Sequence, residues 1–277
     1  MLRLLQIEFI KLWNNRASKV LIISYFVLLS SIALVAAIKF DIGPIKFHLA
    51  ELGIFNFPYI WHFNTFIASF FKLFLAIVIV SMMANEYSNK TIKQNLIDGL
   101  SKKEFILSKF LTVLTFSIVS TLFLFVVSLV LGLIYSNYTE VSIIFTDLEY
   151  LLAYFIKLVG FFSFCLFVGI LIKRSAFALG FLILWQVFEG FVRGMIRWKL
   201  FNSETTDTIM GFFPLNSMWN LLKEPFRRLS AVQNLGAQIG EDFKYDYAVH
   251  WHEIAIVLCW TAIFVYLSYV LLKKRDL

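Results

Sequence analysis

The sequence is poor in charged residues, in helix-breaking residues and in the residues that build redox or metal sites. Charged residues make up 16% of the 277 positions, whereas about a quarter is usual in soluble domains. Four Pro and 12 Gly provide few breaks in long helices, and two Cys are too few for a disulfide scaffold. This composition argues against a soluble enzyme, a disordered chain and a disulfide-rich domain.

Apolar residues, by contrast, are abundant and occur in long runs. They make up 60% of the chain and include 32 Phe. A membrane-spanning helix needs about 20 mostly apolar residues. Six stretches meet this requirement: 19–38, 62–84, 106–135, 150–172, 175–196 and 253–272. We therefore predict an all-α integral membrane protein with six transmembrane helices, the first of them retained as a span rather than cleaved as a signal peptide.

The basic residues predict the orientation of these spans. The formal net charge is +7, and most Lys and Arg fall in four segments: 1–19, 85–109, 173–174 and 273–275. The segment 136–149 has no basic residue and three acidic ones. Because Lys and Arg concentrate in cytoplasmic loops, both termini are predicted to be cytoplasmic, and 197–252 is predicted to be a long external loop. The positive charge thus indicates topology, and no nucleic-acid partner is expected.

The first 18 residues are predicted to form an amphipathic helix that lies in the membrane interface. Its two faces separate apolar from polar residues, with Leu2, Leu5, Phe9, Leu12 and Trp13 against Arg3, Glu8, Lys11, Asn14 and Asn15. An apolar face with Trp and a basic polar face is typical of interfacial helices. A simple topogenic anchor is the alternative.

The segment 85–105, between the second and third spans, has the pattern of a short surface helix. Ile92, Leu96 and Leu100 recur every four residues and form an apolar stripe. Gly99 is placed to end the helix in the left-handed conformation. The motif S-x-x-E that follows is a capping box, which opens the third span. A helix held in this way is suited to receive a mechanical push from a soluble partner, and an ordinary amphipathic connector is the alternative.

Four charged residues fall inside otherwise apolar spans: Lys72, Lys157, Glu189 and Arg193. Such residues are costly in a membrane unless they are paired, hydrated or able to reach the interface. Glu189 and Arg193 stand four residues apart, which is the spacing of an intrahelical ion pair. The four residues predict either a polar vestibule in the outer half of the membrane or one structural pair with two lysines that extend to the interface.

A metal centre has weaker support. His250, His252 and Glu253 are adequate zinc ligands, but residues two positions apart diverge on a helix. No metal site is predicted. An enzyme that uses the histidines and acidic residues of 241–253 stays an alternative.

Three stretches together resemble a known family. They are the opening LQIEFIKL (Leu5–Leu12), the segment EY-x-x-x-TI followed by SKKEFILSK (Glu86–Lys109), and FFPLN (Phe212–Asn216). They are similar to the entry helix, the coupling segment and the last long loop of type-2 permeases of bacterial ATP-binding-cassette (ABC) transporters, which include drug, lantibiotic and polysaccharide exporters. Six spans with both ends inside also match this class.

The resemblance implies that 1–277 is a single permease domain in a bacterial inner membrane, paired with an identical or homologous second half. It would form the translocation pathway of an exporter driven by a separate ATPase. The residues implied in coupling to that ATPase are Glu86, Thr91, Ile92, Lys93, Leu96, Lys102 and Glu104. No G-x-x-x-x-G-K-[ST] motif occurs, so ATP and Mg are expected in the partner chain, and this chain is expected to be non-catalytic and without a cofactor. The alternative is a subunit that passes ATPase strokes to an external partner through 197–252.

Overall fold

The computed structural model describes residues 2–37, 39–42, 45–48, 53–199, 202–229, 233 and 246–275. Six long helices account for most of these residues: α2 (Arg16–Ala37), α3 (Tyr59–Ser88), α5 (Lys102–Tyr135), α7 (Glu149–Ile172), α8 (Ser175–Lys199) and α12 (Trp251–Lys274). Each includes a stretch long and apolar enough to cross a membrane. The predicted helical membrane protein with six spans is therefore confirmed.

Short elements connect the long helices. They are α1 (Leu2–Asn14), β1 (Lys39–Ile42), β2 (Ile45–His48), α4 (Thr91–Ile97), α6 (Val141–Ile144), α9 (Ser203–Met210), α10 (Pro214–Asn220) and the 3₁₀ turn η2 (Phe226–Arg228). The two strands pair antiparallel, with Lys39 opposite His48 and Ile42 opposite Ile45. The sequence pattern did not predict this hairpin, because it lies in a short connection between two much stronger apolar runs.

α7 is the central helix of the bundle and packs against α3, α5, α8 and α12. Two glycines of α7 permit close approaches to α12 and α3. A side chain at Gly160 would meet Val257 of α12 at 2.8 Å, and one at Gly169 would meet Met83 of α3 at 3.1 Å. Small residues let membrane helices pack closely, because lipid supplies no hydrophobic force that would press them together. α8 lies at the outside of the bundle, and most of its residues face away from the other helices.

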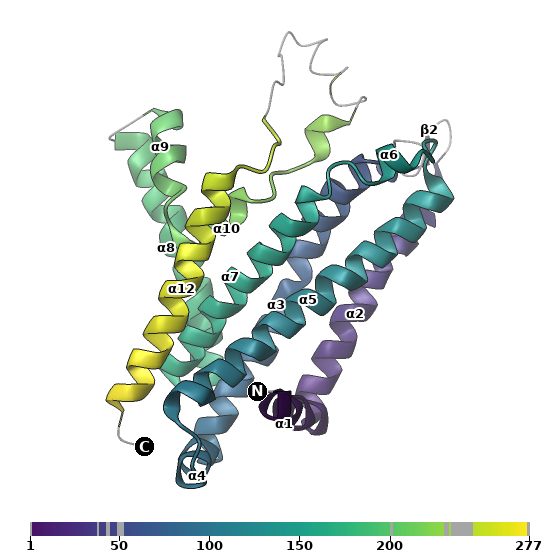
Figure 1. The fold of residues 1–277 in the computed structure, drawn as a ribbon. Helices are drawn as coiled ribbons and strands as arrows, with labels where there is room; N and C mark the ends of the chain where they lie inside the picture. Colours follow the sequence, from purple (N-terminus) through teal and green to yellow (C-terminus); the bar gives the residue numbers. More distant parts are fainter. Residues whose placement is uncertain are drawn as a thin grey trace.

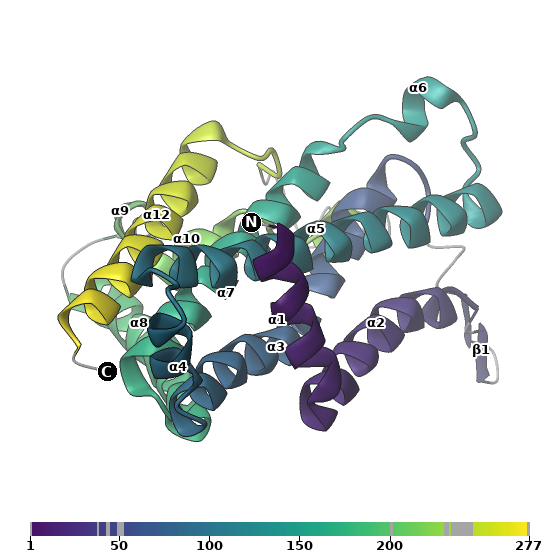
Figure 2. The ribbon, with the colours of Figure 1, turned by 60° about the horizontal axis from the view of Figure 1, so that its bottom comes forward.

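The bundle has two distinct ends. α4, the start of α1 and the last turn of α12 lie at one end, and α6, α9 and the hairpin lie at the other (Figure 1). We call these the α4 end and the α6 end. α1 runs crosswise to the long helices and packs mainly on α5 and α2 (Figure 2). Asn15 lies between α1 and α2, and its side chain caps the start of α2 by accepting a hydrogen bond from the N–H of Ser18 (3.1 Å).

The stretch expected to be a long external loop, 197–252, is largely folded where it is described. α9, α10 and η2 lie in it, and 200–201, 230–232 and 234–245 fall outside the described residues. Arg228 after α10 donates to Tyr150 of α7 (3.2 Å) and to Nδ1 of His62 of α3 (3.1 Å). Because Nδ1 accepts from Arg228, the ring of His62 is neutral, and its Nε2 donates to the carbonyl of Lys223 (2.8 Å). The polypeptide after α10 is thus fixed onto α3 and α7.

Candidate functional site

α4 is a short helix whose C-terminal end is fixed by local bonds. Gly99 follows it with a φ of 96°, and the N–H of Leu100 donates to the carbonyl of Asn95 (3.0 Å), as in a Schellman motif. At the start of α5 the N–H of Glu104 donates to Oγ of Ser101 (3.2 Å), and the N–H of Ser101 donates to Oε2 of Glu104 (3.0 Å). The glycine end and the capping box are both predicted by the sequence, and both are confirmed.

A buried ion-pair network lies beside the first residue of α4. Nζ of Lys109 in α5 lies 2.5 Å from Oε2 of Glu8 in α1 and 2.7 Å from Oε1 of Glu86 in α3. Nζ of Lys11 in α1 also donates to Oε1 of Glu86, at 2.9 Å. The hydroxyl of Thr91 donates to the second carboxylate oxygen of Glu86. These five residues, which we call the Glu86 network, join α1, α3, α4 and α5.

The network balances its own charge inside the protein. It contains two carboxylates and two ammonium groups, so that no net charge is left. Glu8, Glu86 and Lys109 are buried, and Lys109 is not exposed at all, whereas the side chain of Lys11 is 37% exposed. Buried charges are tolerated when they are paired and hydrogen-bonded, and the loss of one member leaves the others uncompensated. Movement of α3 must therefore carry α1 along or break ion pairs, and movement of α4 must carry α3 along or break the hydrogen bond from Thr91 to Glu86.

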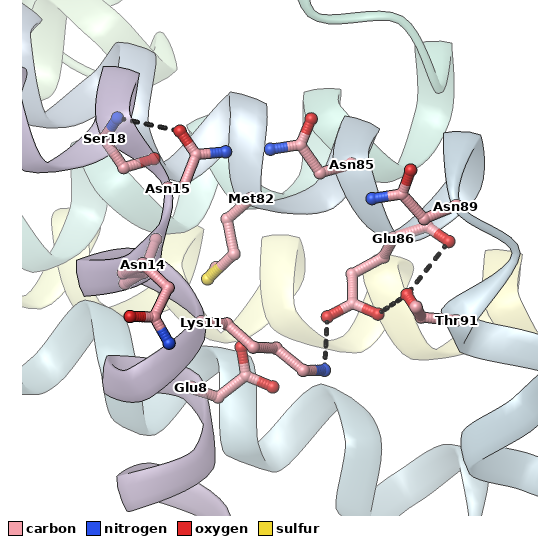
Figure 3. A pocket seen from close by; sticks show the side chains of 11 residues that line it. Glu8, Lys11, Asn14, Asn15, Ser18, Met82, Asn85, Glu86, Asn89 and Thr91 are labelled. Atoms are coloured by element: carbon pink, nitrogen blue, oxygen red, sulfur yellow. Dashed lines mark hydrogen bonds and ion pairs between the residues drawn. The ribbon is translucent and has the colours of Figure 1, made fainter.

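A polar cavity of about 360 Å³ lies between α1 and the last turns of α3. Its wall includes Glu8, Lys11, Leu12, Asn14, Asn15, Ser18, Met82, Asn85, Glu86, Asn89 and Thr91. Figure 3 shows the carboxylate of Glu86 between the ammonium group of Lys11 and the hydroxyl of Thr91. Because the cavity separates the two helices here, α1 is held to α3 by ion pairs more than by apolar packing.

The structure distributes the seven predicted coupling residues over different environments. Glu86 and Thr91 meet in the network, and Ile92 and Leu96 face the core. Lys102 donates to the carbonyls of Lys273 (3.2 Å) and Arg275 (3.0 Å), and Glu104 belongs to the capping box. Lys93 alone of the seven lies on the outer face of α4.

The outer face of α4 consists of Lys93, Gln94 and Ile97, all of them exposed. Ile97 is 75% exposed, which is unusual for a large aliphatic side chain next to polar groups. Gln94 and Ile97 are not among the predicted site residues. The sequence predicts that a partner could reach Glu86, but Glu86 is buried in the network. The residues of α4 that a partner could reach are Lys93, Gln94 and Ile97.

Glu8 and Lys109 are also missing from the predicted site residues. They are 101 positions apart, and no local pattern connects them. The sequence pattern places Glu8 on a polar, solvated face of the first helix. It counts Lys109 only as one of the basic residues that indicate the cytoplasmic side. The one available signal is the position of Lys109 seven residues inside a long apolar helix, where an unpaired ammonium group is unfavourable.

The prediction of an ion pair between Glu189 and Arg193 is wrong. The carboxylate of Glu189 accepts hydrogen bonds from the indole N–H of Trp185 (2.7 Å) and from the backbone N–H groups of Leu215 (3.0 Å) and Asn216 (2.8 Å). It therefore caps the start of α10, whose first N–H groups have no partner within the helix. Arg193 instead pairs with Asp207 of α9 at 2.6 Å. The distant contact satisfies N–H groups of α10 that have no partner within the helix, and it does so at a buried position, whereas Arg193 can pair at the surface with Asp207.

Neither Lys72 nor Lys157 shares these contacts. Nζ of Lys72 lies 4.3 Å from the ring centroid of Phe161, and Nζ of Lys157 lies 5.2 Å from that of Trp219. The structure thus separates the four charged residues of the spans into two lysines over aromatic rings, one helix cap and one exposed ion pair.

The histidines near the start of α12 are engaged locally. His250 lies 2.7 Å from Oδ2 of Asp246, and the N–H of Ala248 donates to Oδ1 (3.0 Å). The hydrogen bond from Ala248, followed by that from His250, lowers the pKa of Asp246. Within the described ranges no group of three His, Cys, Asp or Glu is arranged to hold a metal ion.

Six long apolar helices with α7 at their centre, and a crosswise helix and a short helix tied together at one end, define a polytopic membrane protein. The family model described as ABC-2 family transporter protein matches residues 6–277. The chain therefore belongs to this family and is a membrane subunit of an ABC transporter. No curated protein matches it.

Proposed function

We propose that this chain is the permease half of an ABC exporter, driven by a separate ATPase that docks on the outer face of α4. In this proposal the α4 end is cytoplasmic, both termini are cytoplasmic, and a second identical or homologous permease completes the pathway in a bacterial inner membrane. ATP and Mg bind the partner ATPase, and this chain has no catalytic residue of its own.

The observation that carries the proposal is the joining of an exposed face to a buried network within one short helix. Lys93, Gln94 and Ile97 present a cation, an amide and an apolar side chain to the outside of α4. Thr91, at the start of the same helix, is bonded to Glu86 and through it to α1 and α5. A push on α4 therefore reaches three other helices through short contacts.

Docking on α4 is tested with the double change Lys93→Glu and Ile97→Asp. Loss of the apolar contact and reversal of the charge should weaken co-purification of the partner ATPase by at least about tenfold. Drug- or lipid-stimulated ATP turnover of the complex should fall in parallel. The melting temperature of the purified permease should not change, because both side chains are exposed.

The matched control is Lys199→Glu, an exposed charge reversal at the far end of α8. It should leave both capture and turnover intact. Full capture and turnover by the double variant would remove α4 as the docking element.

The alternative of mechanical transmission to an external partner draws on the α6 end. There η2 is anchored to α3 and α7 through Arg228, which would carry movement of those helices outward. Transport of a cargo that stops when the outer face of α4 is altered would support export over this alternative.

A further inference from the structure

Lys157 of α7 is a fully buried cation without a hydrogen-bond partner in the part of the chain that the structure describes. It stands eight residues after the first residue of α7, or about 12 Å along the helix. This depth lies inside an apolar span, where an unpaired ammonium group is strongly unfavourable. The ring of Trp219, 5.2 Å away, offsets only part of that cost.

Lys72 of α3 brings a second cation to the same region. Its Nζ lies 4.3 Å from the ring centroid of Phe161, which follows Lys157 by one helical turn on the same face of α7. Lys72 on α3 therefore reaches α7 one helical turn beyond Lys157. Two cations on facing membrane helices favour a negatively charged group between them.

The protein supplies no such group within the described ranges. Neither lysine forms a salt bridge there. Glu189 is the acidic residue in the interior of a neighbouring span, but its two oxygens are occupied by Trp185 and by two N–H groups of α10. Among the described residues, therefore, no acidic side chain serves as the counter-ion of Lys157 or Lys72.

Trp219, whose ring lies beside Lys157, belongs to an aromatic surface on the outside of the bundle. Trp219 is 46% exposed and Phe70 is 48% exposed, and their ring centroids are 5.9 Å apart. Phe66 packs on both of them. α10, which presents Trp219, is fixed at its other end by the Glu189 cap. The ring of Trp219, on the seven-residue helix α10, thus lies beside the buried ammonium group and also forms part of an exposed aromatic surface.

We propose that Lys157 and Lys72 bind the anionic headgroup of an amphipathic molecule whose apolar part lies against Phe66, Phe70 and Trp219. The headgroup carries a phosphate or a carboxylate. Binding requires that Trp219 move aside, after which the anion replaces the ring as the partner of Lys157. The inference deepens the proposed function, because it names the chemical class that the permease carries.

Lipid binding to the purified chain tests this site without any ATPase. The chain in dodecyl maltoside is incubated with phosphatidylglycerol or phosphatidylcholine of the same acyl chains, and the first bound lipid is measured by native mass spectrometry. We expect at least about tenfold preference for phosphatidylglycerol. Lys157→Met and Lys72→Met should each bring that preference close to parity. An unchanged preference in both variants would overturn the proposal.

Three controls accompany the lipid measurement. Lys199→Met, which removes another lysine beside a Trp ring (5.9 Å from Trp198) but at an exposed position, should keep the preference. Millimolar inorganic phosphate should not displace the bound lipid, and displacement would assign the site to a free anion and contradict the amphipathic ligand. Lys157→Met should melt at the same or a higher temperature, because it removes an unpaired buried charge, and a lower melting temperature would show that Lys157 is structural.

The lipid site and the docking site are tested independently of each other. None of the lipid measurements involves α4 or ATP. Failure of lipid selectivity therefore leaves the docking proposal standing, and failure of docking leaves the lipid site standing.

Discussion

Replacing Lys109 by Met should lower the stability of the permease more than any other single change at the α4 end. The ammonium group of Lys109 is fully buried between Glu8 and Glu86, at 2.5 and 2.7 Å. Its removal leaves the buried carboxylate of Glu8 without its ion-pair partner and takes one partner from Glu86, and the loss of one member of a buried ion pair costs about 3–5 kcal/mol. The melting temperature of the detergent-solubilised protein measures the effect.

A second variant separates charge from packing at this position. Glu86 keeps Lys11 and Thr91 when Lys109 is gone, whereas Glu8 has no other ion-pair partner in the described part of the chain. Adding Glu8→Gln to Lys109→Met should therefore restore much of the lost stability. Lys103→Met, an exposed change on the same helix, should have almost no effect. Equal destabilisation by Lys109→Met and Lys103→Met would contradict the buried network.

Glu189→Gln should destabilise the protein, and Arg193→Gln should not. The carboxylate of Glu189 accepts three hydrogen bonds, two of them from N–H groups at the start of α10. The amide of Gln turns one acceptor into a donor that faces those N–H groups, and lost hydrogen bonds to a charged group cost about 1.5–3 kcal/mol. Arg193 and Asp207 are 43% and 59% exposed, so their pair contributes about 1 kcal/mol at most.

The double variant decides between the observed contacts and an intrahelical ion pair. If Glu189 and Arg193 were partners, removing both would recover the stability lost by removing either one. Because they have separate partners, the double variant should instead melt at the temperature of Glu189→Gln, lowered slightly further by the second change. Recovery in the double variant would restore the ion pair that the four-residue spacing suggests.

Local patterns predict local structure well in this chain. Apolar runs indicate the six spans because each run has to satisfy the length of a bilayer by itself. Gly99 and the capping box at Ser101 and Glu104 are likewise readable, since their hydrogen bonds close within a few residues. The position of α4 and its C-terminal end could therefore be predicted from the sequence, whereas its start after the left-handed Lys90 was not predicted.

Contacts between distant segments could not be predicted in this way. Glu8 meets Lys109 and Glu189 meets Asn216 only because the bundle brings α1 to α5 and α8 to α10. In both cases the sequence pattern assigns a charged residue to solvent or to its nearest helical neighbour, although burial demands a more distant partner. The rule that a charge inside an apolar helix needs a partner identifies the right residues but not the partners.

The most direct test of α4 as the cytoplasmic docking helix is the labelling of a single cysteine at Ile97. Cys165 is buried and Cys259 exposed, and both are first replaced by Ala. A membrane-impermeant maleimide should label Ile97→Cys only from the cytoplasmic side, and the bound ATPase should block that labelling. Thr139→Cys, exposed at the α6 end, should be labelled only from the opposite side and should not respond to the ATPase. Labelling of Ile97→Cys from outside the cell, or labelling that the bound ATPase leaves unchanged, would contradict the assignment of α4.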